Sequence, residues 1–237
     1  MSAPQVLVLA KTPEPGRVKT RLCPPCTPEQ AARIAAAALA DTLDTVATAT
    51  AGARILVVDG DHPAPAGWAR LAQRGGPLAD RLANAFADTR PVADTRPVAD
   101  TRLVADHRGT AAATLLIGMD TPQLTAAHLD AAVGLLGTAD GPDAVLGPAD
   151  DGGWWALGLR EPGHAEALRA IPTSTAHTGR LTLAALRRRG LRVHLLPRLR
   201  DVDTAADAHA VAALCPPGSR FAVAVDADVP SAAAVGR

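Results

Sequence analysis

Apolar runs of strand length alternate in this chain with segments of helical periodicity, and no other feature restricts its fold as strongly. Most of the runs are too continuous for strands that expose one face to water. Strands separated by helices need crossover connections, so we predict an α/β fold: a three-layer α/β/α sandwich around a mostly parallel sheet. Ligands of such sheets bind at the carboxyl ends of the strands. The predicted strands are 6–10, 55–58, 114–118, 144–146, 154–159 and 191–196.

Helix-capping residues mark the segments between these runs. Thr27, Pro28 and Gln30 form an N-terminal capping pattern that leads into a helix over 31–49. Similar signals predict three further helices: from Thr125 to about residue 137, over 181–189 with an end at Gly190, and from Thr204 with Asp207 in the capping position.

Length and charge restrict the partners of the protein. A chain of 237 residues, 48% of them hydrophobic, can bury one large core, and we expect a single domain over 1–215 with a C-terminal tail over 216–237. The 24 basic and 24 acidic side chains cancel, so we expect neither a nucleic-acid nor a membrane partner. Apolar stretches fall short of the ~20 residues of a spanning helix, and a cytoplasmic location is expected. Small molecules are the expected partners, and a homodimer is left open.

A hexapeptide repeat interrupts the pattern. ADTRPV occurs at 87–92 and 93–98 and returns as ADTRLV at 99–104. Because a period of six fits no solenoid, and because the prolines disfavour a continuous helix, we predict a local insertion over 87–106. It is expected to be a mobile surface excursion without a catalytic role.

A Gly/Pro loop with four cations follows the first apolar run. Lys11, Arg17, Lys19 and Arg21 would lie at the carboxyl edge of the sheet, where cations and backbone N–H groups can surround a phosphate chain. The spacing is not that of GxxxxGK[ST], and the chain has no GxGxxG. We therefore predict an anion-binding loop of another kind; the alternative is a solvated basic loop.

Three aspartates could hold a hard cation beside such an anion. Asp120 ends the run TLLIGMD, and Asp201 and Asp203 alternate along an extended segment, which would point both to one side. Mg²⁺ commonly takes one or two carboxylates and completes its shell with phosphate oxygens and water. Two alternatives stay open: Asp120 could serve as a turn or N-cap group, and Asp203 could merely precede the Thr204 cap.

The segment GPADDGGWWALGL joins an acidic pair to two glycines before an apolar strand. The glycines would let the backbone approach a ligand closely, and Asp151 could order a sugar hydroxyl, a base or a metal-bound water. A simple acidic turn is the alternative. No histidine has a partner in a recognisable nucleophile elbow, so a hydrolase triad is not supported.

These residues give the chain a resemblance to the bacterial "glycosyltransferase" family of the nucleotide-diphospho-sugar transferase superfamily. The resemblance implies a Rossmann-like GT-A domain that binds a nucleotide. The KTRL and DVDT segments also look like those of the phospholactate and phosphoenolpyruvate guanylyltransferases. The matching segments run nearly end to end: AKTPEPGRVKTRL, QRGGPLADRLANAF, LLIGMDTPQLTAAHL, LGPADDGGWWALGL, IPTSTAHT and LRDVDTAADAHAV.

The resemblance also implies roles for individual residues. Asp120, Asp201 and Asp203 would bind Mg²⁺ or Mn²⁺, and Lys19 and Arg21 would contact phosphate. Catalysis is expected to depend on Lys19, Arg21, Asp120 and Asp151. The nucleotide would be bound by Ala10, Lys11, Gly16, Arg17, Lys19, Arg21, Gly75 and Arg81.

Two reactions suit this set of residues. The favoured one is nucleotidyl transfer from a nucleoside triphosphate to a small phosphorylated acceptor, because the first loop resembles those of pyrophosphorylases. The alternative is transfer of a sugar from a nucleotide-diphospho-sugar, with Asp151 as a base toward an acceptor hydroxyl. A non-catalytic nucleotide-binding or scaffold protein is the third possibility.

Overall fold

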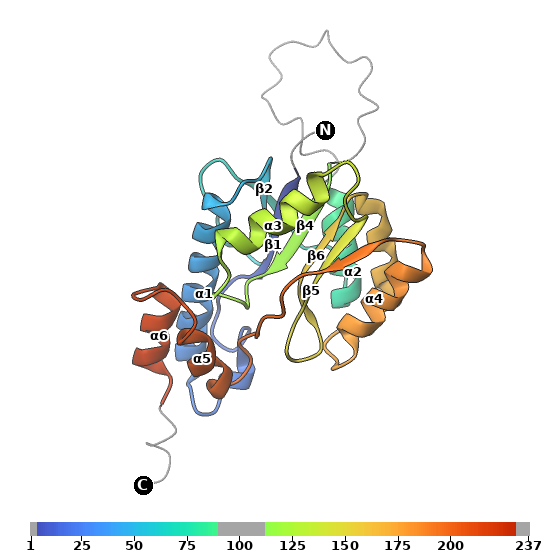
Figure 1. Ribbon diagram of the computed structural model, residues 1–237. Helices are drawn as coiled ribbons and strands as arrows, with labels where there is room; N and C mark the ends of the chain where they lie inside the picture. The colour runs from blue at the N-terminus through green and yellow to red at the C-terminus, as the bar shows by residue number, and fades with distance from the viewer. Residues whose placement is uncertain (1–3, 90–111, 231–237) are drawn as a thin grey trace.

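A computed structural model describes residues 4–89 and 112–230 and confirms the predicted α/β fold (Figure 1). Its seven-stranded sheet has the order β3-β2-β1-β4-β6-β5-β7, in which only β6 runs antiparallel to its neighbours. The strands are β1 (Gln5–Lys11), β2 (Arg54–Asp59), β3 (Ala69–Ala72), β4 (Thr114–Gly118), β5 (Ala144–Pro148), β6 (Trp154–Leu159) and β7 (Val193–Leu195). The short edge strand β3 adds to the predicted set.

Three predicted helices begin at their predicted capping residues, the fourth begins at Thr178 and not at residue 181, and the helices Leu78–Asp88 and Arg220–Asp228 add to the predicted set. The helices are α1 (Pro28–Thr48), α2 (Leu78–Asp88), α3 (Ala126–Gly137), α4 (Thr178–Arg188), α5 (Ala205–Ala212) and α6 (Arg220–Asp228), with the 3₁₀ segments η1 (Thr20–Leu22) and η3 (Pro162–Ala170). Capping boxes on Thr27, Thr125 and Thr204 begin α1, α3 and α5. In each box two backbone N–H groups at the helix start receive side-chain acceptors, which explains why these starts could be read from the sequence.

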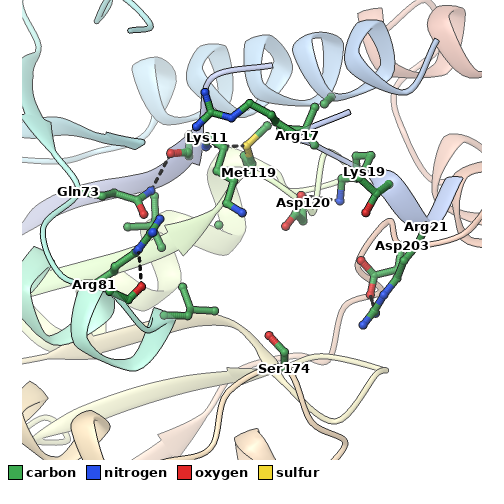
Figure 2. A pocket seen from close by; sticks show the side chains of 18 residues that line it. Lys11, Arg17, Lys19, Arg21, Gln73, Arg81, Met119, Asp120, Ser174 and Asp203 are labelled. Atoms are coloured by element: carbon green, nitrogen blue, oxygen red, sulfur yellow. Dashed lines mark hydrogen bonds and ion pairs between the residues drawn. The ribbon is translucent and has the colours of Figure 1, made fainter. Parts of the chain in front are cut away.

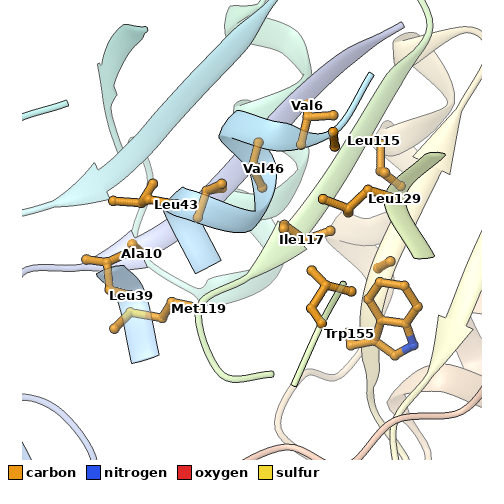
Figure 3. Close-up of a cluster of buried hydrophobic side chains, with 14 of the residues drawn as sticks. Val6, Ala10, Leu39, Leu43, Val46, Leu115, Ile117, Met119, Leu129 and Trp155 are labelled. Carbon is orange, nitrogen blue, oxygen red and sulfur yellow. The ribbon is translucent and has the colours of Figure 1, made fainter. Parts of the chain in front are cut away.

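Alternation along the strands sends side chains to two cores. Val6 and Val8 of β1 face α1 and α3, where Leu39, Val46 and other side chains form the cluster shown in Figure 3. Leu7, between them, faces the opposite layer of α2, η3 and α4, which contributes Phe86 among others. The sheet is therefore covered on both faces, which explains its nearly continuous apolar strands.

A third core joins the C-terminal segment to the outer side of α1. Ile34 and Ala38 of α1 pack with Phe221 and Val225 of α6, and Val202 lies in the same cluster. Part of the segment expected as a tail over 216–237 is thus a helix packed on the domain. The domain boundary at 215 itself stays a prediction.

Most of the hexapeptide repeat lies outside the described residues. α2 ends at Asp88, inside the first copy, and the description resumes at residue 112 before β4. Within the described ranges, no helix is long and apolar enough to cross a membrane.

Candidate functional site

Several strands end at one edge of the sheet, and a cavity of about 550 Å³ opens there (Figure 2). Lys11 ends β1, Gly118 ends β4, and Gln73 directly follows β3. The Gln73 side-chain amide donates a 2.7 Å hydrogen bond to the carbonyl oxygen of Ala10, and the Lys11 N–H approaches the Met119 sulfur at 3.3 Å. These contacts join the three strand ends into one wall of the cavity.

The cavity is strongly cationic for a protein with no net charge. Five cationic side chains line it, against two carboxylates, those of Asp120 and Asp203. The four cations of the basic loop thus lie around one concave surface, and anion binding by this loop stays a prediction. The five are Lys11, Arg17, Lys19, Arg21 and Arg81.

Lys19 links the basic loop to the aspartates. Its ammonium lies 2.5 Å from an Asp120 carboxylate oxygen and donates to the carbonyl oxygen of Val202, and only 7% of its side chain is exposed. Its backbone has φ +49°, a left-handed conformation that costs a residue with a side chain roughly 1–2 kcal/mol. Such strain is typical of positions held for function.

Arg17, Arg21 and Arg81 form further ion pairs at the cavity; Arg17 lies 2.7 Å from a Glu14 carboxylate oxygen. The Arg21 guanidinium lies 3.1 Å from an Asp203 carboxylate oxygen. Arg81 lies 2.8 Å from Asp59, at the end of β2, and also donates to the carbonyl oxygen of Gly76. The guanidiniums of Arg21 and Arg81 keep further N–H donors for a ligand.

Two predicted glycines lie outside the residues that line the cavity. Gly16 and Gly75 adopt φ values of +76° and +112°, so each shapes a turn beside the site. Gly76, which the sequence did not single out, lines the cavity instead. Their predicted contacts with a nucleotide stay predictions.

Neither Asp120 nor Asp203 caps a helix in the described ranges. Thr125, not Asp120, is the N-cap of α3, and the Thr204 side chain caps α5 without help from Asp203. The carboxylates of Asp120 and Asp203 are thus free of helix capping and line the cavity.

Asp201 lies apart from Asp203 in an adjoining cavity of about 190 Å³, which Asp151 also lines. Burial, and then the charges of Asp120 and Asp151, raise the pKa of Asp201 to about 8, and Lys19 opposes this effect. Its Oδ1 atom is buried without a hydrogen-bond partner in the part of the chain that is described. The Asp151 carboxylate accepts a 2.7 Å hydrogen bond from the Gly153 N–H, so the acidic turn is present as well.

This arrangement offers a divalent cation one or two carboxylate ligands but no complete protein site among the described residues. Across the described ranges, no three His, Cys, Asp or Glu side chains lie close enough together to form a metal site. Mg²⁺, however, often takes only one or two protein carboxylates and otherwise uses phosphate and water. The unpartnered Asp201 oxygen, beside the charge of Asp120, is a donor of the kind that such an ion requires.

Sequence reasoning missed the segment 173–175. Ser174 lines both cavities and has φ +59°; it and Lys19 are the only non-glycine residues with positive φ among those described. The motif IPTSTAHT had served only as part of the resemblance. Its signal is a backbone conformation, which residue types alone do not reveal.

Comparisons with known proteins agree with this fold. The model of a family described as "Uncharacterized protein conserved in bacteria (DUF2064)" matches residues 32–175. No curated protein matches the chain in sequence.

Solved structures cover nearly the whole chain. One, from Desulfovibrio desulfuricans G20 and provisionally described as a nucleotide-diphospho-sugar transferase, has a TM-score of 0.76 at 24% identity over 96% of this chain and 98% of that one. Rv0371c of Mycobacterium tuberculosis H37Rv, solved in complex with manganese, has a TM-score of 0.51 at 19% identity over 89% and 98%. A CMP:2-keto-3-deoxy-manno-octonic acid synthetase complexed with CTP has 0.52 at 10% identity over 89% and 98%. At these identities the likeness establishes the fold.

Proposed function

The chain belongs to the DUF2064 family, and we propose that it is a transferase with a nucleotide substrate. The observation behind this proposal is the cavity at the carboxyl edge of the sheet, where five cations meet the carboxylates of Asp120 and Asp203. Cations beside carboxylates suit a phosphate chain that arrives with a divalent cation. The names of two structures with the same fold, one of which contains CTP, support this substrate class.

The favoured reaction is nucleotidyl transfer. A phosphate oxygen of a small acceptor attacks the α-phosphorus of a nucleoside triphosphate, and the bond from that phosphorus to the β-phosphate oxygen breaks. Pyrophosphate leaves with the electron pair, and no general base is needed because the attacking oxygen is already anionic. Lys11, Arg17, Lys19 and Arg21 would offset the charge of the triphosphate and of the leaving group. The likeness to guanylyltransferases stays a prediction.

One or two of the three predicted ligands, Asp120, Asp201 and Asp203, would hold Mg²⁺ or Mn²⁺, because no three carboxylates of the described residues lie close enough to share one ion. When bound, the cation would neutralise phosphate charge and help to orient the phosphate chain. In the unliganded protein the Lys19 ammonium contacts Asp120. When a nucleotide binds, this ammonium would turn partly from the carboxylate to a phosphate oxygen.

Glycosyl transfer is the second candidate, favoured by Asp151. This carboxylate lines the adjoining cavity, where it could accept the proton of an acceptor hydroxyl that attacks a nucleotide-sugar. A nucleoside diphosphate would then leave. The third candidate is a nucleotide-binding protein without catalysis.

A nucleotide-by-metal screen tests the proposal. We expect nucleoside triphosphates or nucleotide-sugars with Mg²⁺ or Mn²⁺ to raise the melting temperature, because a ligand at 100 times its Kd stabilises the native state by about 2.7 kcal/mol. Release of pyrophosphate from a triphosphate and a phosphorylated acceptor identifies nucleotidyl transfer. Release of a nucleoside diphosphate identifies glycosyl transfer. The absence of any shift with every nucleotide and metal contradicts all three candidates.

Asp120→Asn tests the site itself. The variant should lose metal-dependent nucleotide binding, since the amide keeps the shape of the side chain but not its charge. Asp61→Asn is the matched control, because the Asp61 side chain is fully exposed and does not line the cavity. Metal-dependent binding that survives in Asp120→Asn would remove this residue from the site.

A further inference from the structure

The smaller cavity differs from the larger one in its chemistry. Its volume of about 190 Å³ is about a third of that of its neighbour, and Leu9, Leu78, Gly118 and Ser174 line both. A ligand can therefore extend from one cavity into the other across this shared boundary.

Charge separates the two cavities most clearly. Five cations line the larger cavity, whereas no Lys, Arg or His is among the described residues that line the smaller one. Asp151 and Asp201 are the only acidic residues among the described residues that line it, and burial, by raising its pKa, keeps the Asp201 carboxyl largely protonated at neutral pH. Its remaining surface is partly apolar and partly hydroxyl: Leu82, Leu116 and Trp154, together with Thr173, Ser174, Thr175 and Thr178.

The two loops around the smaller cavity are fixed to each other. The Gly179 N–H donates a 2.8 Å hydrogen bond to the carbonyl oxygen of Gly152. A Cβ atom at Gly152 would lie 2.1 Å from the carbonyl oxygen of Ala176, and one at Gly179 would lie 2.4 Å from that of Gly153. Only glycine allows this approach, so the acidic turn and the segment 173–178 form a preorganised wall.

Ser174 occupies the boundary between the cavities. Its φ of +59° is costly for a residue with a side chain and points to a role besides folding. The Thr175 and Thr178 hydroxyls lie 3.2 Å apart and bond within the loop. Among the described residues, the Ser174 hydroxyl has no such partner, so it is available to a ligand. Figure 2 shows it across the cavity from Lys19 and Asp120.

We infer that the smaller cavity holds the part of the acceptor that does not react, that this part is uncharged or cationic, and that Ser174 positions it. The inference rests on the proposed transferase function and specifies its acceptor. In the favoured nucleotidyl transfer, the reacting phosphate of the acceptor would lie in the larger cavity. A hydroxyl- or amine-bearing group with an apolar side would fill the smaller one, whereas a carboxylate there would face the carboxylate of Asp151.

Two phosphate esters that differ at one group test whether the smaller cavity prefers an uncharged or cationic group to a carboxylate. Glycerol 3-phosphate carries a hydroxymethyl group where 3-phosphoglycerate carries a carboxylate. Because Trp154 lines the smaller cavity, binding can be followed by tryptophan fluorescence without any turnover, with Trp154→Phe as the check on the signal. We expect glycerol 3-phosphate, and also phosphoethanolamine, to bind about tenfold more tightly than 3-phosphoglycerate. Asp151→Asn should narrow that difference.

Ser174 is tested by a pair of variants. Ser174→Gly suits the left-handed backbone and should raise the melting temperature, whereas Ser174→Ala should leave it nearly unchanged. Both remove the hydroxyl, and both should weaken glycerol 3-phosphate binding by about tenfold. A purely structural role would weaken binding only where stability falls. Thr50→Ala, at an exposed residue that lines neither cavity, is the control.

Each outcome decides the inference separately from the proposed function. Equal or tighter binding of 3-phosphoglycerate overturns it, as does a lack of any response to all three esters, or unchanged binding in both Ser174 variants. The expected preference supports it. If that preference appears but no nucleotide shifts the melting temperature, the transferase proposal fails while the smaller cavity remains a binding site for uncharged or cationic groups.

Discussion

The ion pairs of two regions of this molecule, the contact between α1 and α6 and the larger cavity, differ in how many hydrogen bonds the protein supplies to each carboxylate. Between α1 and α6, Arg33 makes two hydrogen bonds to Asp228, at 2.9 and 2.6 Å, and Arg220 reaches both Asp41 and Asp44. The other Asp41 oxygen accepts the Phe221 N–H. These carboxylates are satisfied by the protein itself, as expected of a structural contact.

At the cavity the same chemistry is left incomplete. Lys19 and Asp120 meet through one carboxylate oxygen, Arg21 and Asp203 meet through one N–H, and the buried Oδ1 of Asp201 has no partner among the described residues. In these two regions, then, carboxylates that receive several hydrogen bonds hold helices together, and carboxylates that receive few line the cavities where a ligand is proposed.

The largest expected effect is on the free energy of unfolding, through the contact between α1 and α6. Phe221 is fully buried between α6 and α1, and Phe221→Ala should lower the free energy of unfolding by about 3–5 kcal/mol through lost burial and a cavity. Urea unfolding followed by circular dichroism measures the loss. Nucleotide affinity, titrated under conditions where the variant is folded, should stay within about threefold of wild type. A tenfold loss of affinity would show that the two regions are not separate.

A somewhat smaller effect is expected on catalysis, through the cavity. Lys19→Met should lower kcat/KM about a hundredfold, or about 2.7 kcal/mol, because the ammonium would contact developing charge on the phosphates. It should also lower the stability of the unliganded protein, since Asp120 and Asp201 lose their cation. Steady-state kinetics on the folded variant test this. Arg74→Met, which breaks the exposed Arg74–Asp88 pair, is the control. A fall of less than threefold for Lys19→Met would contradict the proposed role.

The smallest effect concerns pH. Hydrogen bonds from Arg33 hold the pKa of Asp228 below its ordinary value. The unfolded state therefore binds the proton more readily, and the pair contributes stability above pH ~4 that is lost as the pH falls through the lower, folded-state pKa. Asp228→Asn should cost at most about 1 kcal/mol at pH 7, because the pair borders solvent. Urea midpoints at pH 7 and pH 3 should show the wild-type advantage closing in acid. An advantage that grows in acid would contradict the assignment.

The sequence predicts those elements whose signals lie within a few adjacent residues. Thr114–Gly118 is an apolar run buried from both sides, and the capping box at Thr27 lies within four residues, so both elements could be located without the structure. β3, the segment ARLA at a sheet edge, alternates half-buried and exposed residues and gives little apolar signal. α6 lies in the segment predicted as a tail; only its residues Phe221 and Val225 are buried, so its apolar pattern is weak.

The same limit applies to the site. Lys19, Arg21, Asp120 and Asp203 follow strands whose ends could be predicted, and the structure places them around one cavity. The separation of Asp201 from Asp203 depends on Val202, which is fully buried in the core beside α1 and fixes the segment between the two cavities. Contacts of that kind arise between segments distant in the chain, and no local pattern encodes them.

The two left-handed residues, Lys19 and Ser174, have a consequence for engineering. A selection that rewarded thermal stability alone would tend to replace Ser174 with glycine, because glycine accepts its backbone conformation without strain, whereas Lys19 would be kept as the cation beside Asp120. At Ser174, a stabilising substitution would then weaken ligand binding. In a library scored for both thermal stability and activity, positions where a substitution raises one and lowers the other would mark the active site without any knowledge of the substrate.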